Sequence, residues 1–556
     1  MINLTPALAI LAKLHFIFDE TTLALARCCA IEGKLSAPLL DQFQIPCFEL
    51  AWVAADILAA ETALSHLGIA EENTREIDHR LSLIFAVQAI STSLTKLEAI
   101  HIELGISLVP LHSIITSSEW ATLRQYGTST EALSAAANLM PLAGDEFAQI
   151  AVSSELTIAQ ESFRRFAADV VAPQAAAIHK NDTIVPENLL QSLREMGVFG
   201  LSIPEKFGGS APDGKEDTLL MIAVTEALSE ASLAAAGSLI TRPEILSRAL
   251  LAGGTEQQKQ LWLPKIAAGE PLCAIAITEP DYGSDAANVS LKGTPTAGGW
   301  LLNGAKAWCT FAGKAGVLMV VVRTDPDKSL GYRGLSVMLT EKPSYDGHEF
   351  AFLQATGGSL TGKAIATIGY RGMHSFDLAF DNFFVPSANV IGEAAGLGKG
   401  FYLTMAGMVG GRMQTAARAC GVMRAAIRAA LQYTQDRKVF GAPLFSYPLT
   451  LAKLASMAAR YAACRRLAYA IGARIDAGTE KHIALQASLV KLLACRSAEW
   501  VTREALQLFG GMGYAEETAV SRYFVDARVL SIFEGAEETL ALKVVARGLM
   551  EQALDK

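Results

Sequence analysis

"AITEPDYGSD", residues 276–285, is an apolar run that ends in a threonine and a glutamate and then turns through proline and glycine. Such a run is typical of a β-strand that closes in a tight turn. The hydroxyl of Thr278 at the strand end, and the backbone N–H groups of a small-residue turn around Ser284, suit a polar heteroaromatic ring and an adjoining pyrophosphate. An ordinary hairpin explains the stretch equally well when it is taken alone.

Similar runs continue to about residue 395. They are short, rich in β-branched or aromatic residues, and separated by Gly, Pro and Asp, as strands usually are. The clearest are LCAIAITE, GWLLNGAKAWCT, VLMVVVRT, GLSVMLTE and LAFDNFFVP. Residues 271–395 are therefore predicted to form a small antiparallel β-barrel or sandwich.

The sequence on both sides of this segment has a helical texture. In "FELAWVAADILAAETALSHLG" apolar residues recur every three to four positions, and the first 135 residues are rich in Ala and Leu. "ANLMPLAGDEF", residues 137–147, is predicted to be a linker. The predicted fold class is α+β, with four parts: an N-terminal helical extension (1–140), a helical domain (152–270), the β-domain (271–395) and a C-terminal helical bundle (396–556).

Composition argues against several classes of protein. At 556 residues the chain is too long for one core, so two or more domains are expected. A net charge of −9 provides no general electrostatic attraction for nucleic acid or anionic lipid. No stretch stays apolar and uncharged for the roughly 18 residues that a membrane span needs. Eight cysteines without a CxxC pair indicate free thiols in a reducing, cytoplasmic setting, and no metal site is predicted.

"AWCTFAG", residues 307–313, places Trp308 and Thr310 two residues apart, on one face of a predicted strand. An indole against the face of a flat cofactor and a hydroxyl at its edge are workable flavin contacts. A tryptophan in the core of the β-domain is the alternative.

Two further segments suit anionic groups. "QLFGGMGY", residues 507–514, is a glycine-rich corner that lets backbone N–H groups approach phosphate or ribose, although no βαβ unit surrounds it. "DRKVFGAPL", residues 436–444, puts Arg437 and Lys438 at a helix end with Phe440 beyond them. The alternatives are a helix C-cap for the first segment and complementation of the helix dipole for the second.

"LSIFEGAEETL", residues 530–540, delivers one carboxylate, Glu534, out of an apolar run. An ionised carboxylate in a dry setting is costly, and burial raises its basicity. A carboxylate retained in such a setting is a candidate for a chemical role. The alternative, an acid that is favoured by the dipole of the last helix, fits Glu537 and Glu538 better.

Together these segments resemble the acyl-CoA dehydrogenase family. "AITEPDYGSDAANV" and "QLFGGMGYAEETAVSRYFVD" resemble its two signature segments, while "NGAKAWCT", "QDRKVFGAPL" and "FEGAEETL" fall in the family's order and approximate spacing over about residues 152–550. The resemblance implies helices, a β-domain and a four-helix bundle, with FAD between them across a subunit interface. It also implies a homodimer or homotetramer, and electron-transfer flavoprotein as the oxidant.

The resemblance extends to single residues. It places Thr278 and Thr310 at the flavin's polar edge, Trp308 against its ring and Ser284 near the pyrophosphate. Glu534 becomes the base that removes the α-proton, while flavin N5 takes the β-hydride. The remaining family positions are Arg412, near the base, and the contacts to a neighbouring subunit's FAD: Arg437, Phe440, Gln507 and Gly511.

Some positions depart from the family pattern. Ala536 and Glu538 stand where many relatives carry Thr and Gln near the adenosine. Asp281 and Tyr282 replace small residues that are common in the signature.

The N-terminal extension narrows the resemblance. An extension that includes "ELAWVAAD", together with "GRMQTAARA" and "DARVLSIFEGAEE", is similar to the methylsuccinyl-CoA dehydrogenases of the ethylmalonyl-CoA pathway. This implies oxidation of (2S)-methylsuccinyl-CoA to mesaconyl-CoA. The alternatives are dehydrogenation of glutaryl-, benzylsuccinyl- or branched-chain acyl-CoA, an acyl-CoA oxidase, and a nucleic-acid-binding homologue, against which the acidic charge and Glu534 argue.

A dicarboxylic substrate requires a cation in its pocket, because a buried unpaired carboxylate is costly. In "AAAGSLITRPEIL", residues 234–246, Arg242 follows Ser238 by one helical turn. A paired arginine and carboxylate would select the diacid and disfavour plain fatty acyl groups. The alternative is a helix-end arginine that pairs with Glu244 or Glu226.

Overall fold

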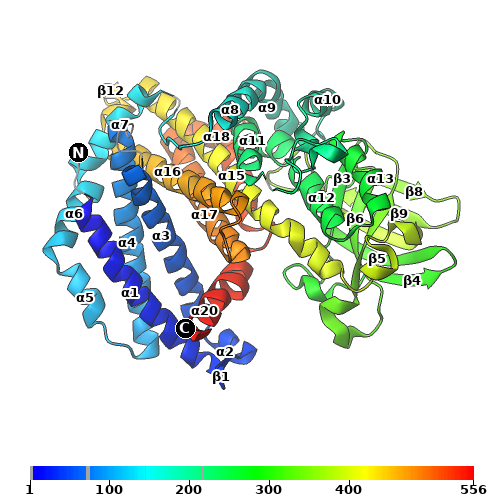
Figure 1. The fold of residues 1–556 in the computed structure, drawn as a ribbon. Helices are drawn as coiled ribbons and strands as arrows, with labels where there is room; N and C mark the ends of the chain where they lie inside the picture. The colour runs from blue at the N-terminus through cyan, green and yellow to red at the C-terminus, as the bar shows by residue number, and fades with distance from the viewer. Residues whose placement is uncertain (1–3, 70–74, 145, 216, 556) are drawn as a thin grey trace. The chain divides into compact units, whose positions relative to one another are not determined.

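The computed structural model describes residues 4–69, 75–144, 146–215 and 217–555 (Figure 1). The chain divides into two compact units: unit 1 is Met1–Thr157 with Thr415–Lys556, and unit 2 is Ile158–Gln414. Unit 1 thus joins the predicted N-terminal extension to most of the predicted C-terminal bundle. Unit 2 holds nearly all of the second predicted helical domain and the strands of the β-domain.

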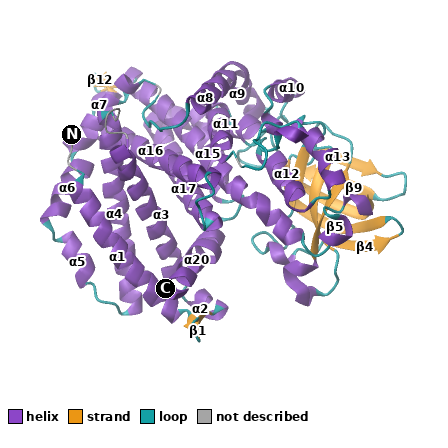
Figure 2. Cartoon of the chain, viewed as in Figure 1, coloured by secondary structure: helices purple, strands orange, loops and turns teal. Residues whose placement is uncertain are grey.

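Unit 1 is almost entirely helical (Figure 2). Its N-terminal part contains α1 (Thr5–Cys28), β1 (Ala30–Ile31), β2 (Lys34–Leu35), α2 (Ala37–Gln42), α3 (Gln44–Ile69), α4 (Glu76–Leu104), α5 (Val109–Ile115), α6 (Ser118–Thr128) and α7 (Thr130–Leu139). Its C-terminal part contains most of α15 (Gly400–Asp436), then β11 (Lys438–Val439), β12 (Ala442–Pro443), α16 (Pro448–Asp476), α17 (Ile483–Phe509), α18 (Ala519–Arg528), α19 (Glu537–Thr539) and α20 (Arg547–Asp555).

The two parts of unit 1 pack directly on each other. Helices α3, α4 and α7 contact α16, and α1 contacts α20. The predicted linker is part of this packing, because Phe147 is 1% exposed and its ring lies edge-on to Tyr461 of α16, with 5.8 Å between the ring centroids. Small buried residues of α16, such as Ala455 and Ala459, allow the helices to approach closely. The extension and the bundle therefore share one core.

Helix α4 is long and apolar enough to cross a membrane by length and composition, and 61% of its most apolar window is buried inside the protein. A buried core helix of a water-soluble protein meets the same criteria of length and composition. The helix ends at Gly105, which adopts the left-handed conformation (φ 65°) that suits a glycine C-cap.

Unit 2 combines helices with one eight-stranded sheet. The helices are α8 (Ser154–Phe166), α9 (Ala172–Lys180), α10 (Glu187–Glu195), α11 (Thr218–Ala231), α12 (Thr241–Gly253), α13 (Glu256–Ala267) and α14 (Glu393–Gly396). The strands are β3 (Cys273–Ala276), β4 (Lys292–Thr296), β5 (Gly299–Thr310), β6 (Val317–Arg323), β7 (Leu335–Glu341), β8 (Glu349–Leu353), β9 (Ser359–Ala364) and β10 (Ser375–Pro386).

The sheet is mainly antiparallel, in the order β3-β6-β4-β5-β10-β9-β8, with β7 paired to β6. Strand β3 departs from the predicted antiparallel pattern, because it pairs in parallel with β6. Alternate residues of β6 face two cores, as the two-residue period of a strand dictates. Val317 and Met319 pack with α12 and α13, whereas Leu318 and Val320 pack with β5 and β10. Helices therefore cover one face of this part of the sheet.

Candidate functional site

A buried ion pair anchors the predicted cofactor loop in unit 2. Lys306 Nζ on β5 lies 2.8 Å from Glu279 Oε1, and the two side chains are 0% and 4% exposed. Glu279 also accepts hydrogen bonds from the N–H groups of Ser290 (2.7 Å) and Leu291 (2.8 Å). Burial raises the pKa of the Glu279 carboxyl, but the ammonium and these donors outweigh it, so the pKa lies below its usual value. The loop after β3 is thus fixed in place.

Two of the predicted flavin-edge residues belong to adjoining backbone segments. The Thr278 carbonyl accepts a hydrogen bond from the N–H of Ala307 at 2.9 Å, which joins the end of β3 to β5. Thr310, at the end of β5, is 9% exposed, and its Oγ1 lies 2.9 Å from Oγ of Ser375 on β10. Ser284, farther along the loop, is exposed. The structure therefore holds Thr278, just beyond β3, and Thr310, at the end of β5, on segments joined by a backbone hydrogen bond.

Trp308 and Thr310, which were predicted to lie on one strand face, differ in exposure. The Trp308 side chain is 56% exposed, and its φ of 57° interrupts the normal alternation of the strand. A bulky residue in the left-handed region is strained, and such strain is concentrated at functional sites. An exposed indole held against backbone preference fits a flat ring lying on the strand. The core alternative for this tryptophan is not what the structure shows.

Arg242 lies in the first turn of α12 and is 6% exposed. Its Nη1 donates hydrogen bonds to the Ser238 carbonyl at 2.7 Å and to the Tyr370 hydroxyl at 3.4 Å. Across the residues that the structure describes, no carboxylate forms an ion pair with this guanidinium. Burying a cation that has only neutral protein partners costs free energy, unless a bound anion supplies the missing counter-charge.

The two acids that could have paired with Arg242 have other partners. Glu244 accepts a 2.8 Å hydrogen bond from Arg248 Nε and another from the Gln414 amide. Glu226 accepts one from the Gln160 amide at 3.2 Å. The structural alternative for Arg242 is therefore not observed. Ser238 contributes its carbonyl, while its hydroxyl donates to the Leu233 carbonyl at 2.8 Å.

Arg412 is 8% exposed on α15, in the "GGR" segment of unit 2. The glycine at position 410 has a packing reason, because a Cβ there would lie 2.0 Å from Glu244 Oε1. Gln414, two residues after Arg412, accepts a hydrogen bond from Thr241 Oγ1 at 2.9 Å. This part of α15 is thus tied to the helix that carries Arg242.

Glu534 lies in unit 1, in the loop between the 3-10 turn Val529–Ser531 and α19. Its φ is 54°, and Gly535 follows with a φ of 98°, so the chain reverses sharply at the carboxylate. Lys491 of α17 donates a 2.6 Å hydrogen bond to the Gly535 carbonyl and holds the loop. A non-glycine residue in this conformation points to a functional constraint.

The predicted dry setting of Glu534 is only partly correct. Leu530 is fully buried, but Ile532 is 53% exposed and Glu534 itself is half-buried. The 3-10 turn directs Leu530 inward and Ile532 outward, which the apolar run in the sequence does not reveal. The Phe533 ring lies 4.8 Å from the Arg418 guanidinium, so this neighbour is also not purely apolar.

The four residues predicted to face a neighbouring subunit lie in two adjoining segments of unit 1. Tyr433, near the end of α15, stacks on Phe509 at the end of α17, with 4.0 Å between the ring centroids. Phe440 is 98% exposed with a φ of 48°. The others, also exposed, are Arg437, Gln507 and Gly511. An apolar ring held out in water in this way suits contact with another molecule.

Several residues of the candidate site were not predicted from the sequence. Glu279 and Lys306 lie inside the quoted motifs, but nothing in the sequence shows that they pair. Tyr370 and Ser375 lie in "TIGYRGMHSF", residues 367–376, and become visible only through their contacts with Arg242 and Thr310.

Comparison with known proteins gives consistent matches. Models of the N-terminal, middle and C-terminal domains of acyl-CoA dehydrogenases match residues 153–270, 274–383 and 398–550. The sequence is 35% identical to (2S)-methylsuccinyl-CoA dehydrogenase from Cereibacter sphaeroides over 99% of this chain and 98% of that one. Butyryl-CoA dehydrogenase from Megasphaera elsdenii has a similar structure, with a TM-score of 0.65 and 30% identity over 72% of this chain and 99% of that one.

A glutaryl-CoA dehydrogenase from Mycobacterium smegmatis, solved with FADH2, has a TM-score of 0.61 and 23% identity over 70% of this chain and 93% of that one. At that identity the match shows the fold alone.

Proposed function

We propose that this chain, which belongs to the acyl-CoA dehydrogenase family, oxidises (2S)-methylsuccinyl-CoA to mesaconyl-CoA. It is an FAD-dependent oxidoreductase, as members of this family are. The exposed Trp308 indole fits one face of a flavin ring. When bound, FAD supplies a two-electron acceptor for the hydride that leaves the β-carbon.

The choice of substrate is supported mainly by the burial and the hydrogen-bond partners of Arg242. A guanidinium that is 6% exposed and lacks a carboxylate partner among the described residues is prepared for an anionic ligand. The terminal carboxylate of a short diacid thioester supplies that charge. The Tyr370 hydroxyl and the Ser238 carbonyl fix the orientation of the guanidinium, so little of its conformational freedom is lost on binding. A plain fatty acyl chain would leave the cation unpaired.

Glu534 acts as the base in this proposal. Removal of the proton α to a thioester requires a carboxylate held against the substrate, and its backbone N–H is available to polarise the carbonyl oxygen. The left-handed conformations of Glu534 and Gly535 present both groups from one loop.

The match to the methylsuccinyl-CoA dehydrogenase includes the N-terminal extension, which favours the diacid assignment over a plain short-chain one. The likeness to butyryl-CoA dehydrogenase supports the second candidate, oxidation of an uncharged short acyl-CoA. A thioester panel with an artificial electron acceptor separates the two. Faster turnover of butyryl- or isobutyryl-CoA than of methylsuccinyl-CoA would overturn the first candidate.

The partners are part of the same proposal. The extreme exposure of Phe440 (98%) and Tyr514 (86%) supports a second copy of the chain against these segments, in a homodimer or homotetramer. Electron-transfer flavoprotein is the proposed acceptor, and the cytoplasm the proposed compartment. Hydrogen peroxide as the main product in air would instead favour an acyl-CoA oxidase, and a salt-sensitive shift of DNA in a gel would revive the nucleic-acid-binding alternative.

Replacing Arg242 by Met is expected to lower kcat/KM for methylsuccinyl-CoA at least about thirtyfold, mainly through KM. Loss of one member of a buried charge pair costs about 2–5 kcal/mol, and each 1.4 kcal/mol is about tenfold. The variant should fold, because no protein carboxylate is left unpaired. Butyryl-CoA is the matched neutral substrate and should change less than about threefold. Steady-state kinetics on both thioesters decide the matter, and equal losses would remove the assigned role.

A further inference from the structure

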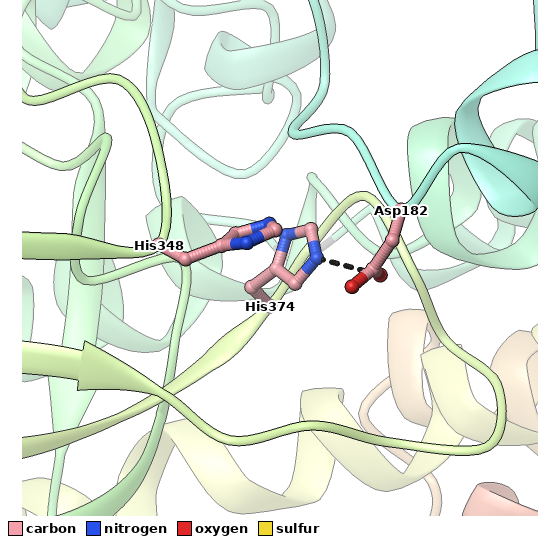
Figure 3. A group of neighbouring side chains, drawn as sticks. All are labelled: Asp182, His348 and His374. Atoms are coloured by element: carbon pink, nitrogen blue, oxygen red, sulfur yellow. Dashed lines mark hydrogen bonds and ion pairs between the residues drawn. The ribbon is translucent and has the colours of Figure 1, made fainter.

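Three side chains from distant parts of unit 2 meet outside the proposed flavin and substrate contacts (Figure 3). Asp182 follows α9, His348 precedes β8 and His374 precedes β10. Each offers one ligand atom, and these atoms all lie within 4.8 Å of one another. His374 lies between the other two: its Nε2 is 3.0 Å from Asp182 Oδ1, and its ring centroid is 4.4 Å from that of His348.

The backbone keeps this cluster together at a cost. Asp182 has a φ of 50° and His374 a φ of 23°, both in the region that non-glycine residues avoid. The His374 carbonyl accepts a 2.8 Å hydrogen bond from the Phe311 N–H, and the His348 carbonyl accepts one of 2.7 Å from the Ala364 N–H. These bonds fix the backbone of His374 before β10 and that of His348 before β8.

The donor set has the chemistry of a transition-metal site. Two imidazoles and a carboxylate are ligands that Zn²⁺, Co²⁺ and Ni²⁺ accept, with a fourth position left for water. The His374 side chain is 4% exposed, whereas that of Asp182 is 43% exposed. Arg371 Nε, 3.7 Å from Asp182 Oδ1, is a competing cation, but at that distance its pairing is weak.

We propose that Asp182, His348 and His374 form a binding site for a divalent transition-metal ion. Ligand atoms around tetrahedral zinc lie about 3.3 Å apart, and the pair formed by His374 and Asp182 already meets this spacing. The remaining distance closes by movement of His348, which is exposed and therefore free to turn. The bound ion joins the end of α9 to the starts of β8 and β10.

The proposed metal site is connected to Thr310, one of the predicted flavin-edge residues. The residue after His374 is Ser375, whose Oγ lies 2.9 Å from Thr310 Oγ1, and these two residues face each other across β10 and β5. A metal that fixes His374 also fixes this hydroxyl pair. The consequence for a flavin near Thr310 rests on the proposed function, whereas metal binding does not.

The test is metal content rather than activity. Untagged, FAD-loaded full-length protein is stripped with chelator, dialysed against Zn²⁺ over a range of concentrations and analysed by mass spectrometry for metal. One zinc per chain is expected. His348→Ala and Asp182→Asn should each weaken binding at least about tenfold, because loss of even an outer-shell partner of a metal ligand typically costs 10–100-fold. Neither side chain is buried, so both variants should fold.

His482→Ala is the matched control, since His482 is an exposed histidine elsewhere on the chain, and it should bind zinc as the wild type does. Wild-type protein without stoichiometric zinc, or cluster variants that bind like the wild type, would overturn the proposal. An unchanged visible spectrum of the FAD in every variant shows that a failure of the metal site is separate from a failure of the proposed function.

Discussion

Glu534→Gln is expected to leave a yellow, FAD-loaded protein that no longer bleaches when methylsuccinyl-CoA is added. Glutamine keeps the size and hydrogen-bonding reach of the side chain but cannot accept the α-proton. A positioned general base contributes typically about 10²- to 10⁴-fold, and the bleaching rate should fall by at least that range. Stopped-flow absorbance of the flavin under anaerobic conditions measures this rate directly, without any electron acceptor.

The control is Glu538→Gln, an equal substitution of a nearby acid in the same segment. Glu538 lies in α19, where an acid complements the helix dipole, so its loss should change the bleaching rate only slightly. Wash-in of deuterium at the substrate α-carbon provides a second readout, because it needs the base alone. Native bleaching in Glu534→Gln, or abolition by Glu538→Gln only, would show that another group removes the proton.

The strands that could be predicted from the sequence are those with a continuous apolar pattern. Side chains are buried on at least one face of each of the strands β5, β6, β7 and β10. Their β-branched and aromatic residues indicate this burial in the sequence. β4, β8 and β9 were missed. "KGTPT" and "SLTGKA" contain glycine, proline or lysine, which weaken any strand signal, although β4 and β9 each lie between two other strands of the sheet.

The residue types of the candidate site were visible in the sequence, but their environments were not. The sequence could place an arginine one turn after Ser238, yet only the structure shows that Glu244 and Glu226 are engaged elsewhere. The apolar neighbours of Glu534 predicted burial, whereas the direction of each side chain depends on a 3-10 turn and a left-handed residue. Pairings across long sequence distances, such as that of Glu279 with Lys306, have no local signature at all.

Asp78→Asn is expected to lower the stability of unit 1 by about 3–5 kcal/mol, the range for breaking a buried ion pair on one side. Asp78 of α4 lies 2.5 Å from Arg466 Nη2 of α16, and both side chains are 1% exposed. The amide leaves a buried guanidinium without its counter-charge, although Ser82 Oγ still accepts a 2.6 Å hydrogen bond from Nη1. Burial already lowers the pKa of Arg466 to about 10. Thermal melts of the full-length holoenzyme should show a loss of several degrees.

The control is Glu76→Gln, on the same helix, which removes an ion pair with Arg80 in which Glu76 is 62% exposed and which should contribute less than about 1 kcal/mol. The double variant Asp78→Leu with Arg466→Met removes both charges and should recover much of the loss, because an apolar pair needs no compensation. If the extension were an independent attachment, Asp78→Asn would melt like Glu76→Gln. A large single loss with recovery in the double variant would show that the extension completes the core of the bundle, since α4 then supplies the charge that α16 buries.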